Sequence, residues 1–141
     1  MRPRQAIAVL ALAGAFVALY LTLFKIGVIG ELTCSVGDCE TVNTSPWATL
    51  LHIPVAAWGF GAYVTIFLLA TAGLQEKYED SRAISRILAG IAAWSVLFSA
   101  YLTYLELFVI HAICIWCVTS ACIVTLIFVA SAWDLRATAT E

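Results

Sequence analysis

Residues 87–133 read ILAGIAAWSVLFSAYLTYLELFVIHAICIWCVTSACIVTLIFVASAW, and Glu106 is the one charged residue among them. The stretch divides into two apolar runs, 87–110 and 112–133. Each run has the roughly 17 to 25 residues that a helix needs to cross a bilayer. Because the connection between them is so short, the two helices must be antiparallel neighbours. The stretch therefore predicts a transmembrane helical hairpin.

Two further apolar runs, 6–24 and 53–74, are long enough to span a membrane. The whole chain of 141 residues is 63% hydrophobic and 11% charged, with a mean hydropathy of +0.99. A soluble domain of this length is far less apolar. We therefore expect an all-α integral membrane protein whose single domain, residues 1–141, is a four-helix transmembrane bundle. Residues 25–52 would form its one long outer loop.

The basic residues predict how the bundle is oriented. Only Lys25 would lie at the outer end of the bundle, where its long side chain can reach the interface. The other six would share one side of the membrane: Arg2, Arg4, Lys77, Arg82, Arg86 and Arg136. The positive-inside rule then places both termini in the cytoplasm and residues 25–52 outside. A cleaved secretory signal is the alternative for the N-terminus, but its apolar run of about 19 residues exceeds a usual signal core.

Two cysteines lie in the outer loop. Cys34 and Cys39 are separated by Ser-Val-Gly-Asp, a short spacer whose glycine favours a turn, so the two sulfurs can close a small ring. An exposed disulfide of this kind is easily exchanged. A redox-active disulfide and a simple loop staple both fit this pair.

The segment SPWATLL, residues 45–51, predicts a short interfacial helix in the same loop. Ser45 can cap it, a proline follows at the first helical position, and Trp47 lies on its apolar face. This helix could cover a pocket between the outer helix ends or could only anchor the loop in the head-group region.

The second cysteine pair, Cys114 and Cys117, opens the fourth run as CIWC. Both sulfurs would lie on the first helical turn, where unpaired N–H groups and the helix dipole stabilise the thiolate that attacks disulfides. Tetrahedral zinc held with the two loop cysteines is the competing use. Cys122 lies about 140° round the helix from Cys117 and is interpreted as a small packing residue.

Other polar and small residues of the spans are given structural roles. Glu106 and His111, near the outer end of the third span, are interpreted as interfacial residues. Small residues at helical spacing favour close helix approach in lipid. The residues in question are Gly14 with Ala18, Gly59 with Tyr63, and Ser95, Ser99 and Thr103.

Taken in order, the motifs are CSVGDC (34–39) followed by ETVNTSPWAT (40–49), Tyr101-Leu102 in the third span, and CIWCVTSA (114–121). Together they resemble the vitamin K epoxide reductase family, in particular its prokaryotic disulfide-forming branch. The resemblance covers nearly the whole chain. It implies a prokaryotic inner or plasma membrane with the redox cysteines on the outer face, and no role in nucleic-acid binding.

The resemblance also implies a reaction. A secreted thioredoxin-fold protein would pass two electrons to the loop pair, the loop pair would reduce the CxxC pair, and that pair would reduce a membrane quinone, ubiquinone or menaquinone. By position, Cys117 matches the cysteine nearest the quinone and Cys114 the one that exchanges with the loop. Cys39 matches the loop cysteine that pairs with Cys114, and Cys34 would then meet the partner.

The resemblance further implies that Ser45 and Trp47 help to shape the quinone pocket. The sequence departs from the vertebrate enzymes at Ala121, where they have tyrosine, and in its shorter outer loop, so vitamin K epoxide reduction is kept as an alternative. Many prokaryotic members carry a fused thioredoxin-like domain, whereas this chain ends at Glu141, and we expect a separately encoded partner.

Two other classes of protein stay open. The bacterial quinone-coupled disulfide oxidase has four spans and the same task, but its CxxC pair lies in the first outer loop, the reverse of the order found here. A non-enzymatic membrane protein with a zinc-binding or structural cysteine cluster is the second alternative.

Overall fold

The computed structural model describes residues 3–25, 49–50, 53–75, 77–78, 82–110 and 115–139. Four helices in this part of the chain are long and apolar enough to cross a membrane. They are α1 (Pro3–Lys25), α3 (Val55–Ala72), α4 (Arg82–Tyr104) and α5 (Ile115–Ala139). The predicted all-helical bundle with four spans is thus confirmed.

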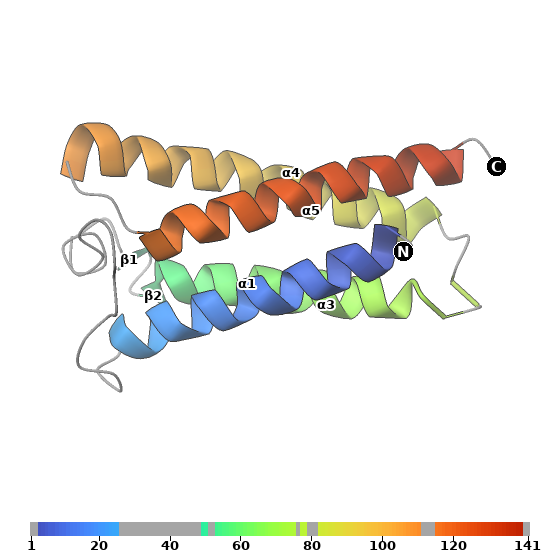
Figure 1. Cartoon of the computed structure of the whole chain (residues 1–141), viewed down its shortest axis with the longest axis horizontal. Coiled ribbons are helices and arrows are strands. Elements are labelled where there is room, and N and C mark those ends of the chain that lie inside the picture. The colour runs from blue at the N-terminus through green and yellow to red at the C-terminus, as the bar shows by residue number, and fades with distance from the viewer. Residues whose placement is uncertain are drawn as a thin grey trace.

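The four helices run antiparallel to their neighbours in a single elongated bundle (Figure 1). Helix α1 packs against α3 and α5, and α4 packs against α5 and, less extensively, against α3. The start of α1 and the end of α5 lie together at one end of the bundle (Figure 1). The start of α5, which includes Cys117, lies at the opposite end, which is called the outer end below after the orientation predicted from the basic residues.

Three helices extend beyond the predicted spans. Helix α1 begins at Pro3, because proline suits the first helical position, where an N–H would have no partner. Helices α4 and α5 include Arg82 and Arg136, since hydropathy marks the apolar part of a helix and not its polar end turns. Helix α4 continues without a break into the π-helical segment η2 (Leu105–Ile110).

A short β-ladder precedes α3. Strand β1 (Thr49–Leu50) pairs antiparallel with β2 (Ile53–Pro54), with Leu50 opposite Ile53. The interfacial helix predicted over 45–51 therefore does not include Thr49 and Leu50, whose backbone groups are used in the ladder instead; its other residues lie outside the described part of the chain. Pro54 has no N–H to extend the ladder, and α3 starts at the next residue.

Small side chains fill the centre of the bundle. On α1, Ala8, Ala11, Ala15 and Ala18 are buried at three- and four-residue spacing, which forms one continuous face. Alanine lets helix backbones approach closely, and van der Waals packing is what holds helices together in lipid. Ile66 of α3, Leu88 of α4 and Ile127 of α5 complete the core.

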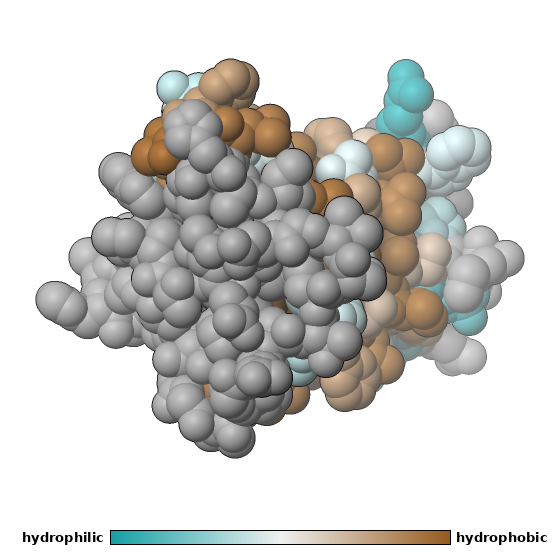
Figure 2. All heavy atoms as spheres, turned by 60° about the vertical axis from the view of Figure 1, so that its left-hand side comes forward, coloured by the Kyte–Doolittle hydropathy of each residue, from teal (hydrophilic) through white to brown (hydrophobic). Residues whose placement is uncertain are grey.

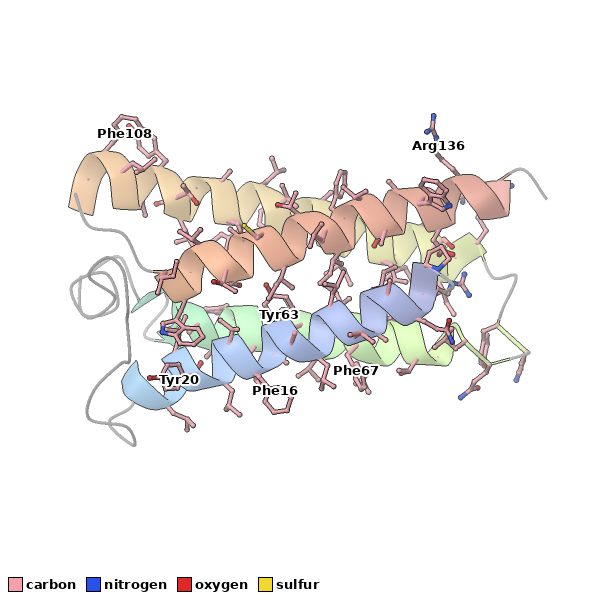
Figure 3. The ribbon with its side chains drawn as sticks, in the orientation of Figure 1. Phe16, Tyr20, Tyr63, Phe67, Phe108 and Arg136 are labelled. Atoms are coloured by element: carbon pink, nitrogen blue, oxygen red, sulfur yellow. The ribbon has the colours of Figure 1, made fainter. Side chains whose placement is uncertain are left out.

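Large apolar side chains point outward. Trp94 is 72% exposed and Trp133 is 69% exposed, and Phe16 and Phe108 project away from the bundle (Figure 3). Figure 2 shows apolar residues along the visible flank of the described helices and hydrophilic residues gathered at the end away from the viewer. In a membrane, this apolar flank faces the lipid chains.

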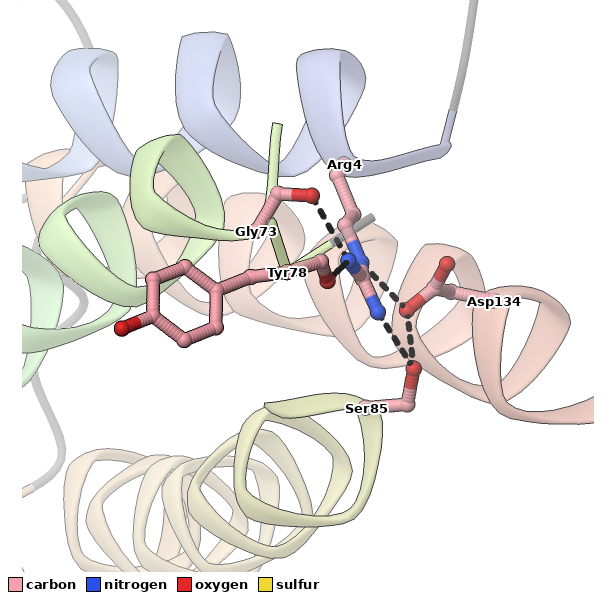
Figure 4. A network of polar contacts seen from close by, with 5 residues as sticks. All are labelled: Arg4, Gly73, Tyr78, Ser85 and Asp134. Carbon is pink, nitrogen blue, oxygen red and sulfur yellow. Dashed lines mark hydrogen bonds and ion pairs between the residues drawn. The ribbon is translucent and has the colours of Figure 1, made fainter. Parts of the chain in front are cut away.

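Arg4 is the centre of a buried polar network at the end of the bundle where α1 begins (Figure 4). Its Nε lies 3.1 Å from Oδ2 of Asp134 on α5, and its Nη2 donates to Oγ of Ser85 on α4 at 3.0 Å. The Ser85 hydroxyl in turn donates to Asp134 Oδ2 at 2.6 Å.

The same guanidinium also closes the turn after α3. Nη1 donates to the backbone carbonyls of Gly73, at 2.7 Å, and of Tyr78, at 2.9 Å. A Cβ atom at Gly73 would lie 2.9 Å from Arg4 Cδ, so the close approach depends on glycine. We call Arg4, Asp134 and Ser85, with these two carbonyls, the Arg4 network; it ties all four helices together at one end.

Candidate functional site

Most of the predicted site residues lie outside the part of the chain that the structure describes. Cys34, Cys39, Ser45, Trp47 and Cys114 lie outside the described residues, as does His111; for Glu106 only the backbone, in η2, is described. Cys117 is the predicted site residue that the structure describes in full.

Cys117 lies in the first turn of α5, which begins at Ile115. Its side chain is half-buried. The first four N–H groups of a helix have no intrahelical acceptor, and the positive end of the helix dipole is at this end. The position therefore favours the thiolate form, the species that attacks a disulfide.

An aromatic contact holds the turn on the side of α1. The rings of Trp116 and Tyr20 meet edge to face, with centroids 5.2 Å apart and planes at 70°. Pairs in this geometry add about 0.5 to 1.5 kcal/mol to the burial of their surface. The residue directly before Cys117 is therefore packed against the outer part of α1.

A polar contact holds the same helix from the side of α3. The Tyr63 hydroxyl donates to the Ser120 backbone carbonyl at 2.8 Å, and the two hydroxyls of this pair lie 2.7 Å apart. Tyr63 is buried and points into the middle of the bundle (Figure 3). A Cβ atom at Gly14 of α1 would overlap the Tyr63 ring, so glycine is required where the ring crosses α1.

An apolar groove opens between α3 and α4. It is lined by Ala57, Trp58, Gly61, Ala62 and Thr65 of α3 and by Ile91 of α4, and its volume is about 520 Å³. The Thr65 hydroxyl donates to the Gly61 carbonyl at 2.8 Å, so the groove presents little unsatisfied polarity. Because α3 begins at the outer end and Ile91 lies in the first half of α4, the groove extends from the outer part of α3 to the middle of the bundle.

Two interpretations of single residues are wrong. Cys122 is a free thiol that is exposed on α5, so it does not pack between the helices. Gly59 does not mediate a close contact with the described helices, since none of their atoms lies within 4 Å of the position of a Cβ there. By contrast, Gly14 does permit a close contact, made by Tyr63 and not by a helix backbone.

The sequence did not lead us to predict that Arg4, Asp134 and Ser85 interact with one another. The sequence marked Arg4 only as a charge near the first span, although Asp134 is the one acidic residue of α5 and follows a long apolar run. An ionisable residue beside an apolar span usually has a partner, and this rule could have predicted the pair of Arg4 and Asp134. Nothing in the sequence identifies Ser85 as the third member.

Within the described residues, no group of three His, Cys, Asp or Glu side chains could hold a metal ion. The zinc alternative would use Cys117 together with Cys34, Cys39 and Cys114. The last three lie outside the described residues, so the alternative stays an untested prediction.

Comparison with known protein families gives one match. Residues 5–132 match the model of the Vitamin K epoxide reductase family. The match runs from the first turn of α1 almost to the end of α5 and so includes most of all four helices and the residues between α1 and α3.

Proposed function

The chain belongs to the vitamin K epoxide reductase family, and from that membership we propose that it passes electrons from a secreted thioredoxin-fold protein to a membrane quinone. The family makes the chain an integral membrane oxidoreductase of thiols and quinones. The finer proposal is that it supports disulfide bond formation on the outer side of the membrane. The single observation that carries it is the family match over 5–132, which spans every cysteine of the two proposed redox pairs.

The proposed reaction is two thiol–disulfide exchanges in series. The partner's dithiol reduces a Cys34–Cys39 disulfide, and the partner leaves with a disulfide. The resulting loop dithiol then reduces a Cys114–Cys117 disulfide, with Cys39 attacking Cys114, and the loop disulfide reforms. Each exchange transfers two electrons and leaves the number of protons on the four sulfurs unchanged.

The CxxC pair then closes its disulfide again and loses two electrons and two protons, which a quinone accepts as it becomes a quinol. Cys117 is the residue proposed to lie nearest this acceptor, with Ser45 and Trp47 covering it. The position of Cys117 in the first turn of α5 supports the first part of this assignment, since its thiolate is stabilised there.

The groove between α3 and α4 supports a membrane quinone as acceptor. A quinone with an isoprenoid tail approaches from within the bilayer, and such a tail needs an apolar surface between helices. The groove supplies such a surface, formed by two alanines, a glycine, an isoleucine, the exposed Trp58 and Thr65, whose hydroxyl is bonded within α3. The residues present therefore fit the tail of a quinone and suit lateral entry from the lipid.

The test is quinone reduction by the purified protein in lipid, with a reduced thioredoxin-fold protein as donor. We expect turnover in the wild type, loss of turnover in Cys117→Ser, and retention in Cys122→Ser, which is the matched control because its exposed thiol has no place in the relay. In Cys34→Ser, turnover with the protein donor should be lost while a small dithiol still supports it.

Absence of turnover with every quinone tried would contradict the proposal. Metal analysis of anaerobically purified protein would then separate the remaining alternatives. One tightly held zinc that disappears in Cys34→Ser would identify a structural cysteine cluster.

A further inference from the structure

On α5, a residue before Cys117 and a residue after it each contact another helix. Trp116, the residue before it, packs edge to face on Tyr20 of α1. Ser120, three residues after it, is bonded to Tyr63 of α3. The turn that carries the proposed redox sulfur is thus attached to two different helices at two points.

The Tyr63 contact reaches across the bundle. Helices α3 and α5 share no extensive contact of their own, since each packs mainly on α1 or α4. The phenol ring crosses this distance next to Gly14, where any side chain would overlap it. The bond to Ser120 is therefore a specific link and not a consequence of two adjacent helix surfaces.

The two hydrogen bonds fix the position of α5 along its axis as well as its rotation about that axis. Because the phenol proton goes to the Ser120 carbonyl, the Ser120 hydroxyl donates to the phenol oxygen, and both groups are satisfied together. Water is scarce at this depth, and a buried hydroxyl without a partner costs about 1 to 3 kcal/mol. A shift of α5 along its axis would break both bonds at once.

The position of this turn matters for the chemistry. Thiolate–disulfide exchange needs the attacking sulfur in line with the disulfide, and loss of that alignment by about 1 Å can slow a reaction by about 100-fold. The first turn of a helix is also where fraying begins. A redox sulfur in a first turn therefore needs support from outside its own helix.

We propose that Tyr63 is a positioning residue for the redox pair: through Ser120, and together with the Tyr20–Trp116 contact, it fixes the turn of α5 that carries Cys117. The proposal rests on the function proposed above. Tyr63 does not itself contact the reacting atoms; it acts through the position of α5.

The test compares Tyr63→Phe with Tyr104→Phe, which removes the hydroxyl of an exposed tyrosine on α4. In Tyr63→Phe we expect kcat for quinone reduction to fall about tenfold while KM for the quinone stays within about twofold. Tyr104→Phe should match the wild type. A lower kcat at an unchanged unfolding temperature would separate positioning from loss of fold, which lowers the active fraction and the unfolding temperature together.

A second pair of variants tests the same link from α5. Ser120→Thr keeps a hydroxyl at this position and should retain wild-type kcat, whereas Ser120→Ala loses one of the two bonds and should fall between the wild type and Tyr63→Phe. The measurement remains informative even if Tyr63→Phe fails to fold.

A third measurement does not need quinone. In protein whose other four cysteines are serine, we expect a small uncharged maleimide to alkylate Cys117 about fivefold faster in Tyr63→Phe than in the parent, because the turn opens more often. An unchanged alkylation rate and an unchanged kcat would overturn the positioning role. A wild type without quinone turnover but with this alkylation difference would refute the proposed function and leave the positioning role standing.

Discussion

Arg4 shows how much one charged residue can contribute when a membrane bundle encloses it. The side chain is 4% exposed and makes hydrogen bonds to a carboxylate, a hydroxyl and two carbonyls. Burying a charge without partners is very costly, so the buried guanidinium of Arg4 requires the carboxylate, the hydroxyl and the carbonyls that surround it. The two carbonyls follow the C-terminal end of α3, where a positive charge is favoured by the helix dipole.

Asp134→Asn is the residue-scale prediction. The change keeps the shape of the side chain and removes its charge, so Arg4 remains buried without a counter-charge. We expect a loss of about 3 to 5 kcal/mol in the free energy of unfolding, measured by denaturation in mixed micelles. Arg136→Leu, at an exposed cation of the same helix, should change it by less than about 0.5 kcal/mol.

The double variant Arg4→Leu with Asp134→Leu sharpens this test. It leaves no buried charge without a partner, so it should cost less than the sum of the two single changes. Strict additivity would mean that Arg4 and Asp134 stabilise the bundle independently and would contradict the network.

At the scale of elements, α3 combines two faces with different tasks. One face carries Tyr63, Ile66 and Ala70 into the core, and the other lines the groove next to α4 with Ala57, Gly61 and Thr65. The small residues of the second face leave room that a larger side chain could occupy. The looser packing between α3 and α4 is thus encoded in α3 itself.

Gly61→Leu is the prediction for this element. In the described part of the chain, no atom lies within 4 Å of a Cβ at Gly61, so leucine should be accommodated and should fill part of the groove. We expect KM for a quinone with a long isoprenoid tail to rise at least about fivefold, with little change for a tail-free quinone. Quinone titration of the purified protein in lipid measures both.

Gly90→Leu is the matched control, because Gly90 of α4 also has open space around its Cβ position but does not line the groove. Equal KM values for both leucine variants and the wild type would exclude the groove as the route of the quinone tail.

For the whole molecule, the end of the bundle that carries the basic residues predicts the orientation in the membrane. Six of the seven Lys and Arg residues belong to the described residues: Lys25 ends α1 at the outer end, and the other five are Arg4, Lys77, Arg82, Arg86 and Arg136. All five belong to the turns at the end where α1 begins and α5 ends (Figure 1). The positive-inside rule assigns this end to the cytoplasm.

Reporter fusions after Glu141 test this orientation. A fluorescent protein should fluoresce there, and alkaline phosphatase, which needs an oxidising compartment, should be inactive. The same phosphatase inserted after Gly30, in the loop predicted to lie outside, should be active. The reverse pattern would place the cysteine pairs in the reducing compartment and would remove the basis for a disulfide-forming role.

The sequence by itself determined the number of spans and the all-helical class, because a run of apolar residues in lipid must satisfy its backbone hydrogen bonds within its own helix. The order and spacing of the cysteine motifs also indicated the family. The sequence also determined the position of Cys117 at a helix start. These properties depend on residues that are close together in the chain, so they can be predicted from the sequence.

Only the tertiary structure decided which residues meet across the bundle. Arg4 and Asp134 are 130 positions apart, Tyr63 and Ser120 are 57 apart, and the ring of Tyr63 finds room only because Gly14 belongs to a third helix. Helical periodicity gives each residue a face on its own helix but fixes neither the rotation nor the height of one helix against another. The packing of small and large side chains fixes both, and it exists only once all four helices are together.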